Sequence, residues 1–270
     1  MDTHASQPIG IFDSGIGGLT IAHAVKYTLP NESIIYFGDT AHLPYGDKPT
    51  SIIQAYANKI GDILLQKHCK VIVIACNSAA AAAYDSLKAH VGKRTKVLNV
   101  IDPMIDYVRT HYKGRPIGLI GTKQTIQSGV YKKKIQALRL GIQLKSLATP
   151  LLASMIEEGF VKGAICQKII DDYLKRPHLK GICALILGCT HYPVIRKQIQ
   201  SFYQSKVSII DASKLTALSL KAFLTANQLL NPGNETTDHF MVSDFSKDFE
   251  KTTRIFFKRK VYLEQVAPWD

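Results

Sequence analysis

Short apolar runs alternate along the chain with longer segments in which apolar and polar residues are mixed. A short run rich in Val, Ile and Leu is typical of a buried strand, and the segments between such runs have the length of helices. Helices are expected at Ser51–His68 and Thr190–Tyr203. The predicted strands are Pro8–Phe12, Ser33–Phe37, Val71–Ala75, Lys96–Ile101, Pro116–Ile120, Gln143–Leu147, Ala184–Leu187 and Val207–Ile210. This alternation predicts βαβ units and a mainly parallel sheet flanked by helices.

Three segments of the first half of the chain have counterparts in the second half, in the same order. The similar pairs are Pro8–Ser14 with Pro116–Thr122, Val73–Ser78 with Ile186–His191, and Val100–Asp102 with Ile209–Asp211. The repeat predicts two related α/β halves. Ligands of open α/β sheets bind beyond the carboxyl ends of the strands. If the halves face each other, Cys76 and Cys189 approach one shared ligand from opposite sides.

Cys76 and Cys189 each end a predicted strand and begin a predicted helix. A thiol at a helix N-terminus lies near backbone N–H groups and the positive end of the helix dipole, which lower its pKa. The same N–H groups can bind a carboxylate. One activated nucleophile would leave the second thiol unexplained, whereas an acid and a base on opposite faces of one carbon use both. Racemases need that arrangement. The other three cysteines, expected only to pack, are Cys69, Cys166 and Cys183.

Two other uses of these motifs are less favoured. The chain has no Cys-x-x-Cys pair and no structural-zinc spacing around Cys183, Cys189 and His191, so no metal site is expected. The loop Asp13–Gly18 is glycine-rich and precedes Asp39 at a distance typical of nucleotide-binding folds. However, the loop lacks the third glycine of that fingerprint, and the Asp13 carboxylate would face a pyrophosphate. An ammonium-bearing ligand suits it better.

Composition narrows the class of protein. The 270 residues are 46% hydrophobic and 20% charged, which is typical of a globular chain with a substantial core. No apolar run has the length of a membrane span, and Met1–Gln7 is too polar for a signal peptide. Five cysteines at irregular spacing favour free thiols in a reducing cytoplasm. The net charge of +13, with clusters at Lys132–Lys134 and Lys258–Lys260, favours a basic surface that attracts anions, and leaves open a nucleic-acid-binding regulator.

The motifs together resemble glutamate racemase, within the aspartate/glutamate racemase superfamily. The segments that carry the resemblance, in the order of that family, are Gly10–Thr20, Leu43–Gly46, Ala75–Ser78, Gly118–Thr122 with Thr125, Pro150–Leu152 with Glu157–Gly159, and Leu187–Pro193. The resemblance implies two pseudo-symmetric Rossmann-like domains with the active site in the cleft between them. It implies a discontinuous first domain, 1–99 plus 210–270, and a second domain, 100–209.

The resemblance also implies roles for individual residues. Cys76 is expected to deprotonate D-glutamate and Cys189 to deprotonate L-glutamate. Asp13, Glu157 and His191 are expected to tune the thiols. The residues expected to bind substrate are Asp13, Ser14, Tyr45, Gly46, Asn77, Ser78, Thr122, Thr190 and His191. No cofactor is expected, because the site itself would carry the acid, the base and the charge stabilisation.

Further expectations follow from the same resemblance. The protein would supply D-glutamate for peptidoglycan synthesis as a cytoplasmic homodimer without a membrane partner. Since the chain lacks a long N-terminal extension, activation by a cell-wall nucleotide precursor is not expected. The nearest alternative is a racemase of aspartate or another amino acid from the same superfamily. The alternative from another class is the nucleic-acid-binding regulator, for which the +13 charge is the argument.

Overall fold

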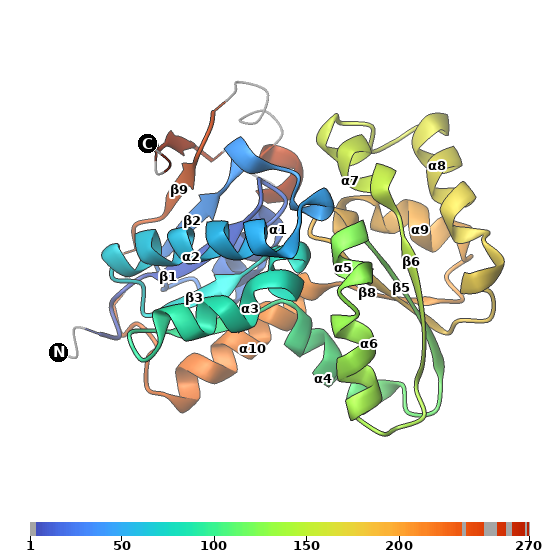
Figure 1. Cartoon of the computed structure of the whole chain (residues 1–270), viewed down its shortest axis with the longest axis horizontal. Coiled ribbons are helices and arrows are strands. Elements are labelled where there is room, and N and C mark those ends of the chain that lie inside the picture. Colours follow the sequence, from blue (N-terminus) through green and yellow to red (C-terminus); the bar gives the residue numbers. More distant parts are fainter. Residues whose placement is uncertain (1–3, 234–235, 246–252, 258–260, 268, 270) are drawn as a thin grey trace.

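The computed structural model describes residues 4–233, 236–245, 253–257, 261–267 and 269. Two lobes lie side by side, each built on its own sheet (Figure 1). The strands are β1 Ile9–Asp13, β2 Ile34–Gly38, β3 Val71–Ile74, β4 Lys96–Asn99, β5 Pro116–Gly121, β6 Gln143–Ala148, β7 Ala184–Gly188, β8 Ser208–Ile210, β9 His239–Val242 and β10 Glu264–Gln265. All strand pairs within the two sheets are parallel.

The two sheets repeat one topology. In the first sheet the strand order is β10-β9-β2-β1-β3-β4, and in the second it is β6-β5-β7-β8. The core order β2-β1-β3-β4 of the first therefore equals the order β6-β5-β7-β8 of the second. Strands β1, β2, β3 and β7 are buried along their whole length, which explains their nearly continuous apolar sequences. The expected fold class, two pseudo-symmetric α/β halves with parallel sheets, is confirmed.

Helices cover the sheets. The α-helices are α1 Leu19–Thr28, α2 Thr50–Gln66, α3 Asn77–Val91, α4 Ile101–His111, α5 Lys123–Gln127, α6 Val130–Ala137, α7 Pro150–Glu157, α8 Ala164–Leu174, α9 Arg196–Phe202 and α10 Ala212–Ala226. The short 3-10 helices are η1 Thr40–His42, η2 Tyr45–Asp47, η3 Pro177–Leu179 and η4 Tyr192–Ile195. Helix α2 packs beside α3, and α1 beside α10. Right-handed crossovers place these two pairs on opposite faces of the first sheet. The last long helix of the chain thus packs on the first lobe (Figure 1).

The structure differs from the predicted elements in three respects. The strand predicted over Lys96–Ile101 ends at Asn99, because the Asn99 Oδ1 atom accepts hydrogen bonds from the backbone N–H groups of Ile101 and Asp102 and so starts helix α4. The helix predicted over Thr190–Tyr203 is divided into η4 and α9. Strands β9 and β10 were not predicted. Strand β9 extends the first sheet by pairing with β2.

One of the two basic clusters lies within the described residues. Lys258–Lys260 lies outside the described residues. In the other cluster, Lys134 forms an ion pair with Asp102 at 2.8 Å. Within the described part of the chain, no helix is long and apolar enough to cross a membrane.

Candidate active site

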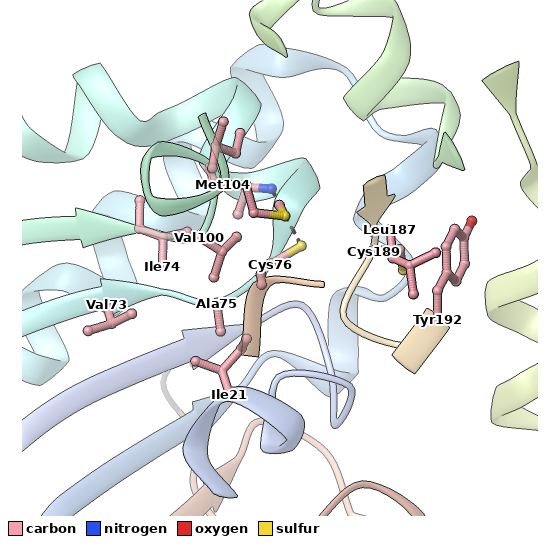
Figure 2. Close-up of a cluster of buried hydrophobic side chains, with 14 of the residues drawn as sticks. Ile21, Val73, Ile74, Ala75, Cys76, Val100, Met104, Leu187, Cys189 and Tyr192 are labelled. Atoms are coloured by element: carbon pink, nitrogen blue, oxygen red, sulfur yellow. Dashed lines mark hydrogen bonds between the residues drawn. The ribbon is translucent and has the colours of Figure 1, made fainter. Parts of the chain in front are cut away.

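A small cavity lies where the carboxyl ends of the two sheets meet. Its volume is about 30 Å³, enough for one or two water molecules. Cys76, after strand β3, and Cys189, after strand β7, both line it, and Figure 2 shows the two side chains on their separate segments. The remaining lining residues are Ser14, Pro44, Tyr45, Gly46, Asn77, Ser78, Thr122, Ala153, Glu157, Gly188, Thr190 and His191. The repeat therefore brings its two cysteines to one closed space.

Cys76 is the N-cap residue of helix α3. Its Sγ accepts a hydrogen bond from the backbone N–H of Ala79 at 3.4 Å and donates one to Ser14 Oγ at 3.5 Å. Burial, with a further contribution from the Asp13 carboxylate, raises the pKa of Cys76 to about 12, although Ala79 and Ser14 act in the opposite direction. The expectation that the helix N-terminus would bring this pKa down is wrong for the free protein, because desolvation outweighs the dipole.

Cys189 lies in a different setting. The segment after strand β7 turns before its helices begin, with η4 starting at Tyr192 and α9 only at Arg196. The expectation that Cys189 begins a helix is therefore wrong. Instead, its Sγ lies 3.5 Å from His191 Nδ1. A basic imidazole replaces the helix N-terminus as the group that can stabilise a thiolate.

His191 links Cys189 to a carboxylate. Its Nε2 atom lies 2.9 Å from Glu157 Oε1, outside hydrogen-bond geometry but within ion-pair distance. Burial by itself lowers the pKa of His191 and is the largest single effect. The negative charges of Cys189 and Glu157 together outweigh it and raise this pKa well above its usual value. The ring is thus poised to hold a proton between a thiol and a carboxylate.

Asp13 lies behind the cavity. Its carboxylate is completely buried and accepts a hydrogen bond from the backbone N–H of Gly15 at 3.2 Å. The hydroxyl of Thr190, which does line the cavity, donates to Asp13 Oδ1 at 3.5 Å. Burial raises the pKa of Asp13, opposed by the charge of His191. In the closed cavity, Asp13 is therefore placed to act through Thr190 and His191.

Polar side chains from both lobes meet at the cavity wall. Ser78 Oγ and Thr122 Oγ1 lie 2.8 Å apart, one at the start of α3 and the other as the N-cap of α5. Asn77 Oδ1 accepts a hydrogen bond from Tyr131 OH at 2.7 Å. Asn77 Nδ2 has no hydrogen-bond partner among the described residues. The wall therefore offers hydroxyl and amide donors that suit a carboxylate ligand.

Glycines allow the lobes to approach each other. A Cβ atom on Gly17 would lie 2.4 Å from His191 Cε1, and one on Gly46 would lie 2.9 Å from Thr122 Cβ. Both contacts are shorter than real Cβ contacts, so any other residue would force the neighbouring side chain to move. The glycine-rich loop after β1 thus allows close packing against His191 of the second lobe.

The residue that suggested a nucleotide site has another role. Asp39 is completely buried and accepts hydrogen bonds from Tyr45 OH at 2.6 Å and Ser243 Oγ at 2.8 Å, and it also contacts His42. It anchors the loop that carries Tyr45 and Gly46 to the cavity and has no oxygen free for a ribose.

Among the residues described, no cluster of His, Cys, Asp and Glu could hold a metal ion.

Three residues that line the cavity were not predicted for the site. Pro44, Ala153 and Gly188 line the cavity. Pro44 and Gly188 lie inside motifs that were singled out, whereas Ala153 on α7 reaches the cavity because α7 packs over it. Tyr131 contacts Asn77 across 54 positions of sequence, so only the tertiary structure joins them. Of the residues predicted for the site, all but Asp13 line the cavity.

The fold and the site together define a class: a two-lobed α/β protein in which one thiol from each lobe lines the same small cavity, each with its own polar surroundings. The Asp/Glu/Hydantoin racemase family model matches residues 20–220. The chain belongs to this family of amino-acid racemases.

Individual relatives agree with this assignment. The chain is 38% identical to a glutamate racemase of Chlorobaculum parvum over 93% of its own length and 92% of the relative's. A glutamate racemase of Aquifex aeolicus is 37% identical over 94% of this chain and 95% of that one. The crystal structure of glutamate racemase from Francisella tularensis in complex with D-glutamate superposes with a TM-score of 0.92 at 38% identity, covering 98% of this chain and 99% of the other.

Proposed function

We propose that this protein interconverts L-glutamate and D-glutamate by acid/base catalysis with two thiols. The single observation that carries the proposal is that Cys76 and Cys189 line the same cavity from the two lobes. The similarity to glutamate racemases, over nearly the whole length of both chains, supports glutamate as the substrate. Aspartate remains the alternative substrate within the family.

The proposed reaction moves one proton onto the carbon and another off it. With L-glutamate bound, the Cys189 thiolate removes the α-proton, and the protonated ring of His191 stabilises that thiolate beforehand. The Cys76 thiol delivers its proton to the opposite face, which yields D-glutamate, a Cys76 thiolate and a Cys189 thiol. The high pKa of Cys76 suits the role of acid in this direction. With D-glutamate bound, the roles are reversed: the Cys76 thiolate removes the α-proton and the Cys189 thiol delivers a proton to the opposite face.

Substrate binding requires more space than the closed cavity offers. A volume of about 30 Å³ holds one or two water molecules, whereas glutamate has ten non-hydrogen atoms. We propose that the lobes separate to admit glutamate and close on it, with hydroxyl and amide donors of both lobes on its carboxylates. Closure would exclude water and strengthen the electrostatic stabilisation of the carbanion. Ser78 and Thr122, which touch across the lobes, would part on opening.

The decisive experiment is incubation of purified protein with L-glutamate in deuterium oxide, without added cofactor. Deuterium at the α-carbon of newly formed D-glutamate is the expected result, because the incoming proton comes from a solvent-exchanged thiol. The same measurement with aspartate decides the substrate: faster turnover of aspartate would overturn the choice of glutamate. Absence of exchange and inversion with both amino acids would remove the proposal.

Three further proposals concern the use of the product, the oligomeric state and the domain division. We propose that the product enters peptidoglycan synthesis in the cytoplasm, where catalytic thiols stay reduced. We propose a homodimer, for which sedimentation velocity should give about twice the 29.9 kDa of one chain. We also propose the domain division 1–99 plus 210–270 and 100–209, supported by β9 joining the first sheet and α10 packing on α1.

A further inference from the structure

The side chain of Asn77 presents two different atoms to two different surroundings. Its Oδ1 atom accepts a hydrogen bond from Tyr131 OH at 2.7 Å. Its Nδ2 atom has no hydrogen-bond partner in the described part of the chain, although Asn77 is only 2% exposed and lines the cavity. A buried N–H group without a partner is unfavourable and rare in native proteins. This donor is therefore available to a ligand that enters the cavity.

Tyr131 belongs to the second lobe, in the first turn of α6, and is 1% exposed. Its hydroxyl proton is the only one that the phenol can donate, and Asn77 Oδ1 accepts it. Burial raises the pKa of Tyr131 well above its usual range, so the phenol keeps this proton at neutral pH. In the observed orientation the phenol donates its proton and the amide oxygen accepts it.

The direction of this bond selects one orientation of the amide. If the amide rotated by half a turn, Nδ2 would face the phenol, the phenol proton would lose its acceptor, and Oδ1 would face the cavity. A carbonyl oxygen facing a substrate carboxylate would repel it. In the observed orientation every one of these groups is satisfied once a carboxylate oxygen meets Nδ2. The hydrogen bond from the buried Tyr131 phenol thus fixes the orientation of the Asn77 amide, with the donor Nδ2 facing the cavity.

We infer that Tyr131 is a positioning residue for the racemase: it holds the Asn77 amide with Nδ2 toward the cavity, where Nδ2 donates to a carboxylate oxygen of the substrate. The identity of the substrate rests on the proposed function. Since the bond joins α6 of the second lobe to α3 of the first, the donor is set only when the lobes are closed. Closure and carboxylate recognition are therefore linked.

The test is a double-substitution series with Tyr131→Phe and Asn77→Ala, measured as KM and kcat for L- and D-glutamate. Tyr131→Phe should raise KM about tenfold with a smaller change in kcat, because a charge-assisted hydrogen bond is weakened. In the Asn77→Ala background the same change should alter KM less than about twofold. Tyr173→Phe is the matched control: its buried hydroxyl contacts the Leu151 N–H and no cavity residue, so KM should stay unchanged.

Several outcomes would overturn the inference. Wild-type kinetics in Tyr131→Phe, or an equal effect of Tyr131→Phe with and without Asn77, would make Tyr131 a structural residue only. If Tyr131→Phe fails to fold, Asn77→Asp decides instead. That variant keeps an acceptor for the phenol and replaces the donor by a carboxylate oxygen, so a KM near that of wild type would contradict the inference.

A measurement without turnover separates this inference from the proposed function. The side-chain amide signals of Asn77 in ¹⁵N spectra of the free protein, assigned with Asn77→Ala, should shift in Tyr131→Phe and not in Tyr173→Phe. If wild-type protein racemises neither glutamate nor aspartate, the proposed function fails while these spectra still test the contact. Unchanged Asn77 signals in Tyr131→Phe would overturn the inference whatever the substrate.

Discussion

The two thiols hold equivalent places in the repeat and have different surroundings. Cys76 caps a fifteen-residue helix and is contacted by a backbone N–H and the Ser14 hydroxyl. Cys189 is followed by a turn and contacts the imidazole of His191, which in turn meets Glu157. Neutral groups and a buried carboxylate that raises its pKa surround Cys76, whereas a basic group contacts Cys189. Equivalent positions in a fold therefore do not imply equivalent chemistry.

This difference has a mechanistic meaning. A racemase needs its two catalytic groups in opposite protonation states at the same moment. Two identical surroundings would favour the same state in both thiols. Burial and Asp13 raise the pKa of Cys76, while the imidazole of His191 lies 3.5 Å from the Cys189 sulfur. In the proposed mechanism, this asymmetry suits Cys189 as the base and Cys76 as the acid for L-glutamate.

The largest expected effect comes from removing either thiol. Cys76→Ala and Cys189→Ala should each lower racemisation at least about 10³-fold, because inversion needs a proton carrier on both faces. Chiral chromatography of the products measures this loss. Cys166→Ala, in a buried cysteine on α8 outside the cavity, is the control and should remain active. Near-native activity in either catalytic variant would contradict the two-thiol scheme.

A one-sided exchange experiment sharpens the comparison further. In deuterium oxide, Cys76→Ala should exchange the α-proton of L-glutamate and not that of D-glutamate, since Cys189 alone remains as a base. Cys189→Ala should show the opposite preference. Proton NMR of recovered substrate measures the exchange. If both variants exchanged the same enantiomer, the assignment of the thiols to opposite faces would be wrong.

Gly17→Ala should disturb only the Cys189 side. The new methyl group would lie 2.4 Å from the His191 ring and displace it. A displacement of about 1 Å at a catalytic group costs about 10²-fold in rate. In Gly15→Ala the methyl group would make an ordinary 3.5 Å contact with Leu43, so kcat should change little. Equal effects in the two variants would show that the loop, and not the imidazole, is responsible.

Glu157→Gln is expected to have the smallest effect, and it is seen mainly in the pH profile. Glu157 raises the pKa of His191, so its neutralisation lowers that pKa and the ring loses its proton at lower pH. The alkaline limb of kcat/KM should therefore move to lower pH, with a loss of about tenfold above neutrality. Glu158→Gln, at an exposed neighbour outside the cavity, is the control. An unshifted limb would exclude Glu157 from tuning His191.

Local sequence predicted the parts of this molecule that depend on local physics. Apolar runs located strands β1 to β8, most clearly β1, β2, β3 and β7, because buried parallel strands require apolar residues on both faces. The paired segments around Cys76 and Cys189 predicted two related halves because a repeated strand order leaves a repeated pattern. The details that failed involve side chains acting on backbone, such as Asn99, at which strand β4 ends two residues before the predicted end.

The sequence by itself was sufficient to predict the fold class, the importance of the two cysteines and the polar motifs beside them. Each of these depends on residues that are close together in the chain. Only the tertiary structure decided which groups touch: His191 with Glu157, Asn77 with Tyr131, and Asp13 behind Thr190. It also decided the pKa of Cys76, since desolvation depends on everything packed around the sulfur and not on the helix that follows it. Contacts between distant segments leave no periodic signal in the chain, and the difference between the thiols consists of such contacts.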